Sequence, residues 1–123
     1  MATEREILDV IGKIESDIGS FIAASLVDIE SGMTLAAKTR RPEFDLALAS
    51  AYNSEMVKQK LKAVRVLNLN TNLEDMLLTL GDQIHLIKLI GPNTFLYLAA
   101  ERNGTNLALV RAAVNRHIGA LNI

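Results

Sequence analysis

The feature that most constrains this fold is the stretch from Glu74 to Arg102, where two turn signals separate three short apolar runs. Glycine, joined by Asp, Pro or Asn, marks each turn. Apolar runs bounded in this way are typical of β-strands, and such short links join antiparallel neighbours. We therefore predict a three-stranded meander, with strands near residues 76–80, 84–90 and 94–100.

Neither face of this meander is polar. In its second run, Ile84, Leu86 and Ile90 alternate with Ile87 and Leu89, so apolar side chains point both ways. A sheet with one solvated face would instead alternate cleanly between apolar and polar residues. Both faces of the meander must therefore be covered by other elements.

The outer run of the meander, from Asp75 to Leu80, has no charge at its middle and no proline. An exposed edge of that kind invites pairing with another chain unless something covers it. The sequence thus indicates a potential contact between copies at this edge.

A helix and a hairpin are predicted ahead of the meander. Thr3 and Glu6 have the spacing of a capping box, and isoleucines then recur every three or four residues, which indicates an amphipathic helix over 4–17. Two apolar runs around an acidic turn that ends in Gly32 predict a β-hairpin over 20–37. A basic loop is expected at 38–41.

Two further helices are expected. The segment 43–62 has helical composition, and its first half is apolar or small nearly all round, which is typical of a helix buried on more than one side. The link 63–73 is compatible with a helical extension, a brief strand or a loop. A turn at 103–105 offers a possible N-cap for a last amphipathic helix that runs from Leu107 to Leu121.

The predicted order is α-β-β-α-β-β-β-α, an α+β fold with a five-stranded antiparallel sheet and helices on both faces. The first and last helices can share one face, which leaves the middle helix alone on the other. Because a single helix covers five strands poorly, a second copy of that helix from another chain would complete the layer. The apolar edge and the middle helix both favour a two-fold dimer.

Composition bounds the remaining possibilities. The 123 residues suit one domain over 1–123, and a net charge of −1 does not favour a nucleic-acid partner. Cysteine is absent from the sequence, and the acidic start MATEREILDV is unlike a secretory signal. No apolar run approaches the ~20 residues of a membrane span, so we expect a cytoplasmic protein without direct membrane insertion.

No pattern of catalytic chemistry emerges from the polar residues. His85 lies within a predicted strand and His117 near the end of the last helix, without convergent carboxylates to form a metal or acid–base site. The acids at 28, 30, 43 and 45 fall in turns and at a helix start, where local hydrogen bonds favour them. Nucleotide-binding glycine motifs are absent from the sequence. We therefore predict no catalytic, cofactor or metal residues, and no enzyme activity.

The chain resembles the roadblock/LC7 superfamily, the dynein-light-chain-like and bacterial gliding-protein-like modules that work with small GTPases. The resemblance lies in the order of elements and in three segments: SLVDIESGMTLA, LEDMLLTLGDQIHLIKLI and FLYLAAERNGTNLALVRAAV. It implies a profilin-like sheet, dimerisation through the second helix and third strand, and a regulatory or scaffolding role. The link 63–73 is longer and more polar than is usual for the family.

From the residues and the resemblance together we predict a non-catalytic homodimeric module that binds or regulates a Ras-like small GTPase or a larger assembly. An exposed arginine can stabilise the transition state of GTP hydrolysis, so Arg40 and Arg41 are candidate partner contacts, with a solvated basic loop as the simpler interpretation. The alternative function is a small-molecule-sensing domain of PAS or profilin-like shape, which would need a pocket lined by aromatic and polar groups. The predicted dimer interface comprises Leu48, Ala49, Ala51, Tyr52, Met56, Met76, Leu78 and Leu80.

Overall fold

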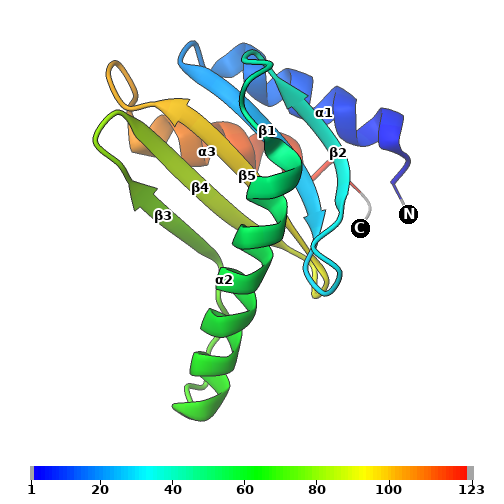
Figure 1. The fold of residues 1–123 in the computed structure, drawn as a ribbon, viewed down its shortest axis with the longest axis vertical. Helices are drawn as coiled ribbons and strands as arrows, with labels where there is room; N and C mark the ends of the chain where they lie inside the picture. The colour runs from blue at the N-terminus through cyan, green and yellow to red at the C-terminus, as the bar shows by residue number, and fades with distance from the viewer. Residues whose placement is uncertain (1, 122–123) are drawn as a thin grey trace.

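The computed structural model describes residues 2–121 and has the predicted order of helices and strands (Figure 1). One five-stranded antiparallel sheet carries three helices. The elements are α1 (Glu4–Asp17), β1 (Phe21–Asp28), β2 (Thr34–Thr39), α2 (Leu46–Val66), β3 (Asp75–Thr79), β4 (Gln83–Ile90), β5 (Thr94–Glu101) and α3 (Leu107–Ile118).

The strands lie in the order β2-β1-β5-β4-β3. The predicted meander is confirmed, because β3 pairs with β4 and β4 pairs with β5, both antiparallel. The predicted hairpin is β1 with β2, and β1 also pairs with β5, which joins the hairpin to the meander. The two edges of the sheet are therefore β2 and β3.

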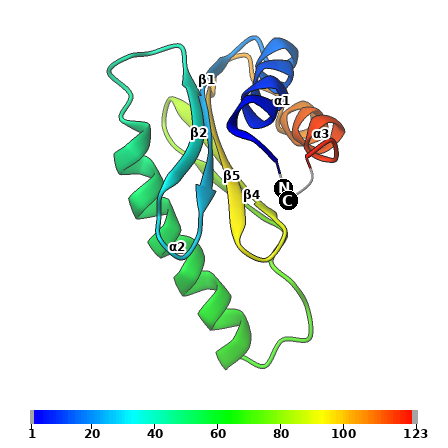
Figure 2. The same cartoon turned by 90° about the vertical axis from the view of Figure 1, so that its right-hand side faces the viewer.

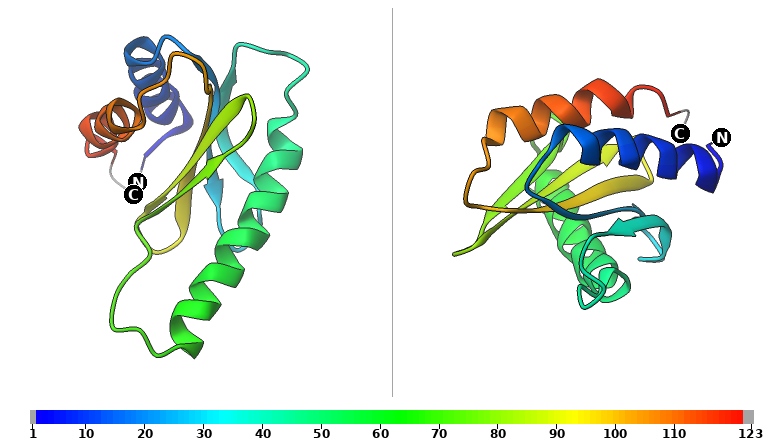
Figure 3. Two further views of the ribbon diagram at one scale, coloured as in Figure 1. Left: turned by 90° about the vertical axis from the view of Figure 1, so that its left-hand side faces the viewer. Right: turned by 90° about the horizontal axis from the view of Figure 1, so that it is seen from above.

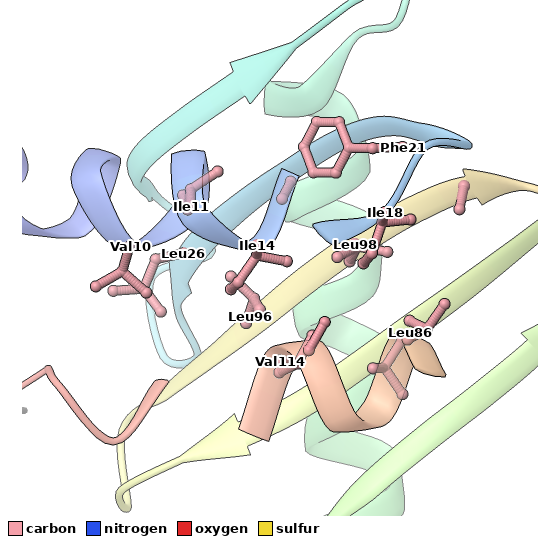
Figure 4. Packing of buried hydrophobic residues seen from close by; sticks show 14 of the residues in the cluster. Val10, Ile11, Ile14, Ile18, Phe21, Leu26, Leu86, Leu96, Leu98 and Val114 are labelled. Atoms are coloured by element: carbon pink, nitrogen blue, oxygen red, sulfur yellow. The ribbon is translucent and has the colours of Figure 1, made fainter. Parts of the chain in front are cut away.

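The helices cover both faces of the sheet, as predicted. Figure 2 shows α1 and α3 on one side and α2 alone on the other. On the two-helix side, Ile11 and Ile14 from α1 and Val114 from α3 pack over Leu96 and Leu98 of β5 (Figure 4). The alternating residues of the strands point to the other side, where α2 adds Leu46 and Val57 to a second cluster.

The predicted alternation within β4 and β5 is also confirmed. Leu86 and Leu98 belong to the cluster under α1 and α3, whereas Ile87, Phe95 and Tyr97 belong to the cluster under α2. All five side chains are buried. Period-two alternation with apolar residues at both phases produces this two-sided burial.

The middle helix differs from the prediction at both ends. It begins at Leu46 rather than Glu43, because Phe44 N–H closes a turn on Arg41 O (3.0 Å) and the Asp45 side chain then caps the helix by accepting from Leu48 N–H (3.0 Å). It ends at Val66, four residues later than expected, so the first part of the uncertain link is helical. The rest of the link, 67–73, is loop up to β3.

Two smaller boundaries also moved. Strand β2 runs from Thr34 to Thr39, so Lys38, predicted to lie in a loop, instead pairs with Ala24 of β1. The N-cap of α3 is Asn106, whose side chain accepts from two backbone N–H groups of the first turn. The capping box of Thr3 and Glu6 at α1 is confirmed in both directions.

Candidate functional site

Helix α2 has a buried side of small and apolar residues and an exposed side with large apolar residues. Its inner side presents Ser50 and Ser54, both buried, and the Ser50 hydroxyl accepts a hydrogen bond from Thr34 Oγ1 on β2 (2.8 Å). On its outer side, Leu48 is 55% exposed and Tyr52 is 72% exposed. Large apolar side chains next to one another on an outer helix face indicate a contact surface rather than chance exposure.

The α2 helix leaves part of its own sheet face uncovered. Its backbone passes closest to β1 and β2, at one side of the sheet. On β3, at the opposite edge, Met76 and Leu78 belong to the α2-side cluster but are only half-buried. Strand β3 has β4 as its single neighbour, so its other edge is unpaired within residues 2–121. The open edge of β3 therefore borders the same face of the sheet that α2 covers.

We call the outer side of α2 together with the open edge of β3 the α2–β3 face. The residues of the predicted dimer interface come from these two elements and, for Leu80, from the turn after β3. Three of its α2 residues and Leu80 are exposed, and the others are half-buried against the chain's own core. The exposed members are Leu48, Ala51, Tyr52 and Leu80, and the half-buried members are Ala49, Met56, Met76 and Leu78.

An open groove of about 440 Å³ lies between α2 and the sheet on this face. Three aromatic rings form its floor. Phe44 stacks on Tyr97 with the ring centroids 6.5 Å apart, and His85 meets Tyr97 edge-on at 5.3 Å. Leu48 and Tyr52 line the same groove. Ring pairs at these separations add to the stability from burial alone.

The groove floor contains a hydrogen-bonded chain. Gln83 Oε1 can only accept, so His85 Nε2, 2.8 Å away, carries the ring proton and donates to it. The other ring nitrogen, Nδ1, then accepts from the Tyr97 O–H (3.2 Å), and burial raises the pKa of Tyr97 to about 12. Burial lowers the pKa of His85, partly opposed by Asp82, which favours this neutral form.

Sequence reasoning missed this aromatic cluster, although His85 and Tyr97 were visible as members of neighbouring strands. His85 pairs with Ala99 in the register of β4 and β5, which places Tyr97 two residues away on the same face. The alternation within β4 and β5 and the short turn between these strands are the sequence signal that could have placed His85 beside Tyr97. Phe44 arrives from the turn ahead of α2, and no local pattern predicts its position.

The two candidate arginines are both engaged within the chain. Arg40 Nε donates to Glu15 of α1 (2.6 Å), its Nη1 donates to Gly19 O (3.0 Å), and its guanidinium lies 5.4 Å from the centre of the Phe21 ring. With Lys38, it holds the pKa of Glu15 below its usual value. Arg41 forms one ion pair, with Glu101. Arg40 therefore has several partners within the chain, although its side chain stays 42% exposed, and the choice between partner contact and solvated basic loop stays a prediction.

Asp28 and His117, two polar residues considered from the sequence, have partners within the chain. Asp28 accepts from the backbone N–H and the hydroxyl of Ser31 (2.9 and 2.6 Å), which closes the β1–β2 turn and lowers the pKa of that carboxyl. His117 Nε2 lies 2.7 Å from Asp17, on the neighbouring α1. Within residues 2–121, no group of three or more His, Asp or Glu side chains is arranged to hold a metal ion. None of the helices in that range is long and apolar enough to span a membrane.

These features define a class of fold: the chain has the roadblock/LC7 fold, as its sequence resemblance implied. Myxococcus xanthus MglB is similar to it with a TM-score of 0.84 and 14% identity, over 95% of this chain and 85% of that one. A structure of MglB with tetrameric arrangement has a TM-score of 0.82 and 17% identity, over 96% of this chain and 85% of that one. A roadblock/LC7 domain from Streptomyces avermitilis has a TM-score of 0.79 and 13% identity, over 90% of each chain. Neither a family model nor a curated protein matches the chain by sequence.

Proposed function

We propose that this chain is a non-catalytic regulatory or scaffolding module that forms a homodimer through the α2–β3 face. The observation that supports the dimer is the position of exposed Leu48 and Tyr52 on the same sheet face as the unpaired β3 edge. In a two-fold dimer, two β3 strands would pair antiparallel and continue the sheet. Each α2 would then cover apolar surface beside the partner's helix.

The groove on this face bears on the alternative function, a small-molecule sensor. It has the aromatic and polar lining that a sensor requires, with Phe44, His85 and Tyr97 on its floor. However, its walls include Leu48, Ala49 and Tyr52, which the dimer uses. We therefore assign the groove to the interface between copies.

Sedimentation over a range of concentrations tests the dimer. We expect a dimer for the unaltered chain and a monomer for Leu48→Asp and for Leu78→Lys, because each places a charge in the buried interface. The matched control is Leu109→Asp, an exposed apolar residue on α3, on the opposite side of the sheet. The homodimer is overturned if the unaltered chain is a monomer at every concentration, or if Leu109→Asp loses the dimer as fully as the two interface variants do.

For the partner, we propose a Ras-like small GTPase or an assembly that contains one. The support is the roadblock/LC7 fold together with the sequence resemblance to modules that work with small GTPases. The dimer would present a continuous sheet and a helix pair as a platform. Capture of a GTPase by the unaltered chain, compared with Leu48→Asp, tests whether the dimer is the binding form.

If the chain also stimulates GTP hydrolysis, Arg41 is the better candidate to enter the GTPase site. Arg41 would break one ion pair with Glu101 to do so, whereas Arg40 would lose Glu15, a backbone carbonyl and the Phe21 ring together. An arginine supplied in this way raises turnover by ~10³–10⁵. Stimulated hydrolysis that is unchanged in Arg41→Ala and Arg40→Ala would limit the role to binding.

A further inference from the structure

The C-terminal end of α2 and the loop after it extend beyond the end of the sheet, away from the body formed by α1, α3 and the strands (Figure 1). A second direction of view shows the same projection, with the loop returning from it to β3 (Figure 3). We call residues 58–69 the distal tip. Leu61 still packs against the core cluster under α2, but the end of the tip beyond it stands apart and meets any flat surface that approaches from that side before the body does.

Positive charge is concentrated at this tip. Residues 56–73 contain four cations and no acid, whereas the whole chain has a net charge of −1, so the remaining residues carry −5. Lys58 forms an ion pair with Glu55 (3.1 Å), but no carboxylate in residues 2–121 pairs with Lys60, Lys62 or Arg65. These three side chains are exposed. Such a polarised molecule turns its tip toward a negatively charged surface.

The end of the tip is apolar. Val66 is 72% exposed, Leu67 is 65% exposed and Leu69 is 49% exposed. A helix cap holds them in place: Asn68 adopts a left-handed conformation (φ 58°), its N–H donates to Arg65 O (3.0 Å), and Leu69 N–H donates to Val64 O (3.1 Å). This pair of bonds is the Schellman motif. The apolar side chains are therefore presented on an ordered turn.

We propose that the distal tip docks the protein on a membrane surface rich in anionic phospholipid. Lys60, Lys62 and Arg65 would bind the lipid headgroups, and Leu67 and Leu69 would enter the headgroup boundary. The docking is peripheral, with the body of the molecule outside the lipid. The overall charge of −1 conceals this arrangement, because the acids lie elsewhere on the chain.

The shape of the tip favours lipid over an acidic protein as its partner. A stable protein interface needs roughly 800 Å² from each partner, which a narrow projection with three apolar side chains does not offer. A lipid surface needs no matching contour, since headgroup charges act on each cation separately and the boundary accepts any protruding apolar group. The short polar side chains of Asn68 and Asn70 are also compatible with headgroups.

Flotation with vesicles of phosphatidylcholine, with and without phosphatidylserine, tests the proposal. We expect binding only to vesicles that contain phosphatidylserine, and weaker binding as salt is raised. Lys60→Gln/Lys62→Gln/Arg65→Gln should weaken binding by at least about tenfold. Leu67→Ser/Leu69→Ser should weaken it without a change in net charge. Both variants alter exposed residues, and a circular dichroism melt checks that they fold.

Two matched controls separate the tip from general charge and general exposure. Arg5→Gln/Lys13→Gln/Arg102→Gln removes the same charge from exposed positions outside the tip, and Leu109→Ser removes an exposed leucine from α3. Both should bind vesicles as the unaltered chain does. The proposal is overturned if phosphatidylserine vesicles are not bound or if Leu67→Ser/Leu69→Ser binds them normally. It is also overturned if the two control variants lose as much vesicle binding as the tip variants. Loss of the sedimenting dimer in the tip variants would assign the tip to the contact between copies instead.

Discussion

Arg111 of α3 and Asp75, the first residue of β3, form a two-point ion pair across 36 residues of sequence. Arg111 Nε and Nη2 lie 3.1 and 3.0 Å from the two carboxylate oxygens of Asp75. A guanidinium and a carboxylate that meet in this paired geometry hold both orientation and position. The pair therefore fastens the start of the open edge strand to a helix on the opposite side of the sheet from α2.

Removal of this pair should loosen the edge more than the rest of the fold. We expect Arg111→Gln to lower the free energy of unfolding by about 0.5–1 kcal/mol, since both groups are partly exposed. Hydrogen exchange at the amides of β3 should accelerate, while exchange in β1 and β5 follows the global change only. Equal acceleration in all strands would mean that Arg111 does not anchor the edge.

The buried His85 predicts a pH dependence of stability. Its pKa in the folded chain lies below 6.5, so the unfolded chain binds the proton more readily. This contribution to stability is complete above pH 6.5 and declines as the pH falls below it, by at most about 1.4 kcal/mol per pH unit. Urea unfolding should show that the free energy of unfolding falls less between pH 7.5 and pH 5.5 in His85→Gln than in the unaltered chain. An unchanged loss would place the titrating group elsewhere.

The carboxylates do not interfere with this comparison. The pKa values of Glu15 and Asp28 are lowered by their hydrogen-bond partners from the ordinary values of 4.5 and 3.8. Their stabilisation is therefore present above those values and is lost only as the pH falls further. A second decline in stability, below about pH 4.5, should appear in both the unaltered chain and His85→Gln.

Gly32 provides a test of backbone strain in the β1–β2 turn. Its φ of +74° lies in the left-handed region, while an added Cβ would meet only ordinary contacts at 3.5 Å and beyond. Gly32→Ala should thus cost about 1–2 kcal/mol from conformation alone. Gly19→Ala is the matched control, because no atom lies within 4 Å of its Cβ and its φ is not positive. Equal thermal melting of both variants would contradict this reading of the turn.

Arg40 should behave as a structural residue. Arg40→Gln removes its contacts with Glu15, Gly19 and the Phe21 ring, and we expect a loss of about 1–2 kcal/mol in the free energy of unfolding. Arg41→Gln removes a single surface ion pair and should change stability by less than about 1 kcal/mol. Chemical denaturation of both variants measures the difference, and the reverse order would show that the two roles are exchanged.

Much of the fold could be read from the sequence, because its signals are local. The capping box of Thr3 and Glu6, the glycines in the turns and the double alternation in 84–100 each act within a few residues. These signals determined the number, order and type of the elements. They also indicated that both faces of the sheet need cover.

The tertiary structure decided which distant groups meet. Phe44 comes from a turn and His85 and Tyr97 come from two strands, and Arg40 reaches Glu15 across 25 residues. The end of α2 at Val66 depended on Asn68, a cap signal present in the sequence but not distinguishable there from an ordinary loop residue. Long-range packing sets where a helix lies on a sheet, so neither the projection of the distal tip nor the separation of its charge follows from local pattern. The sequence by itself determined the elements, and packing between them determined the surfaces that they present.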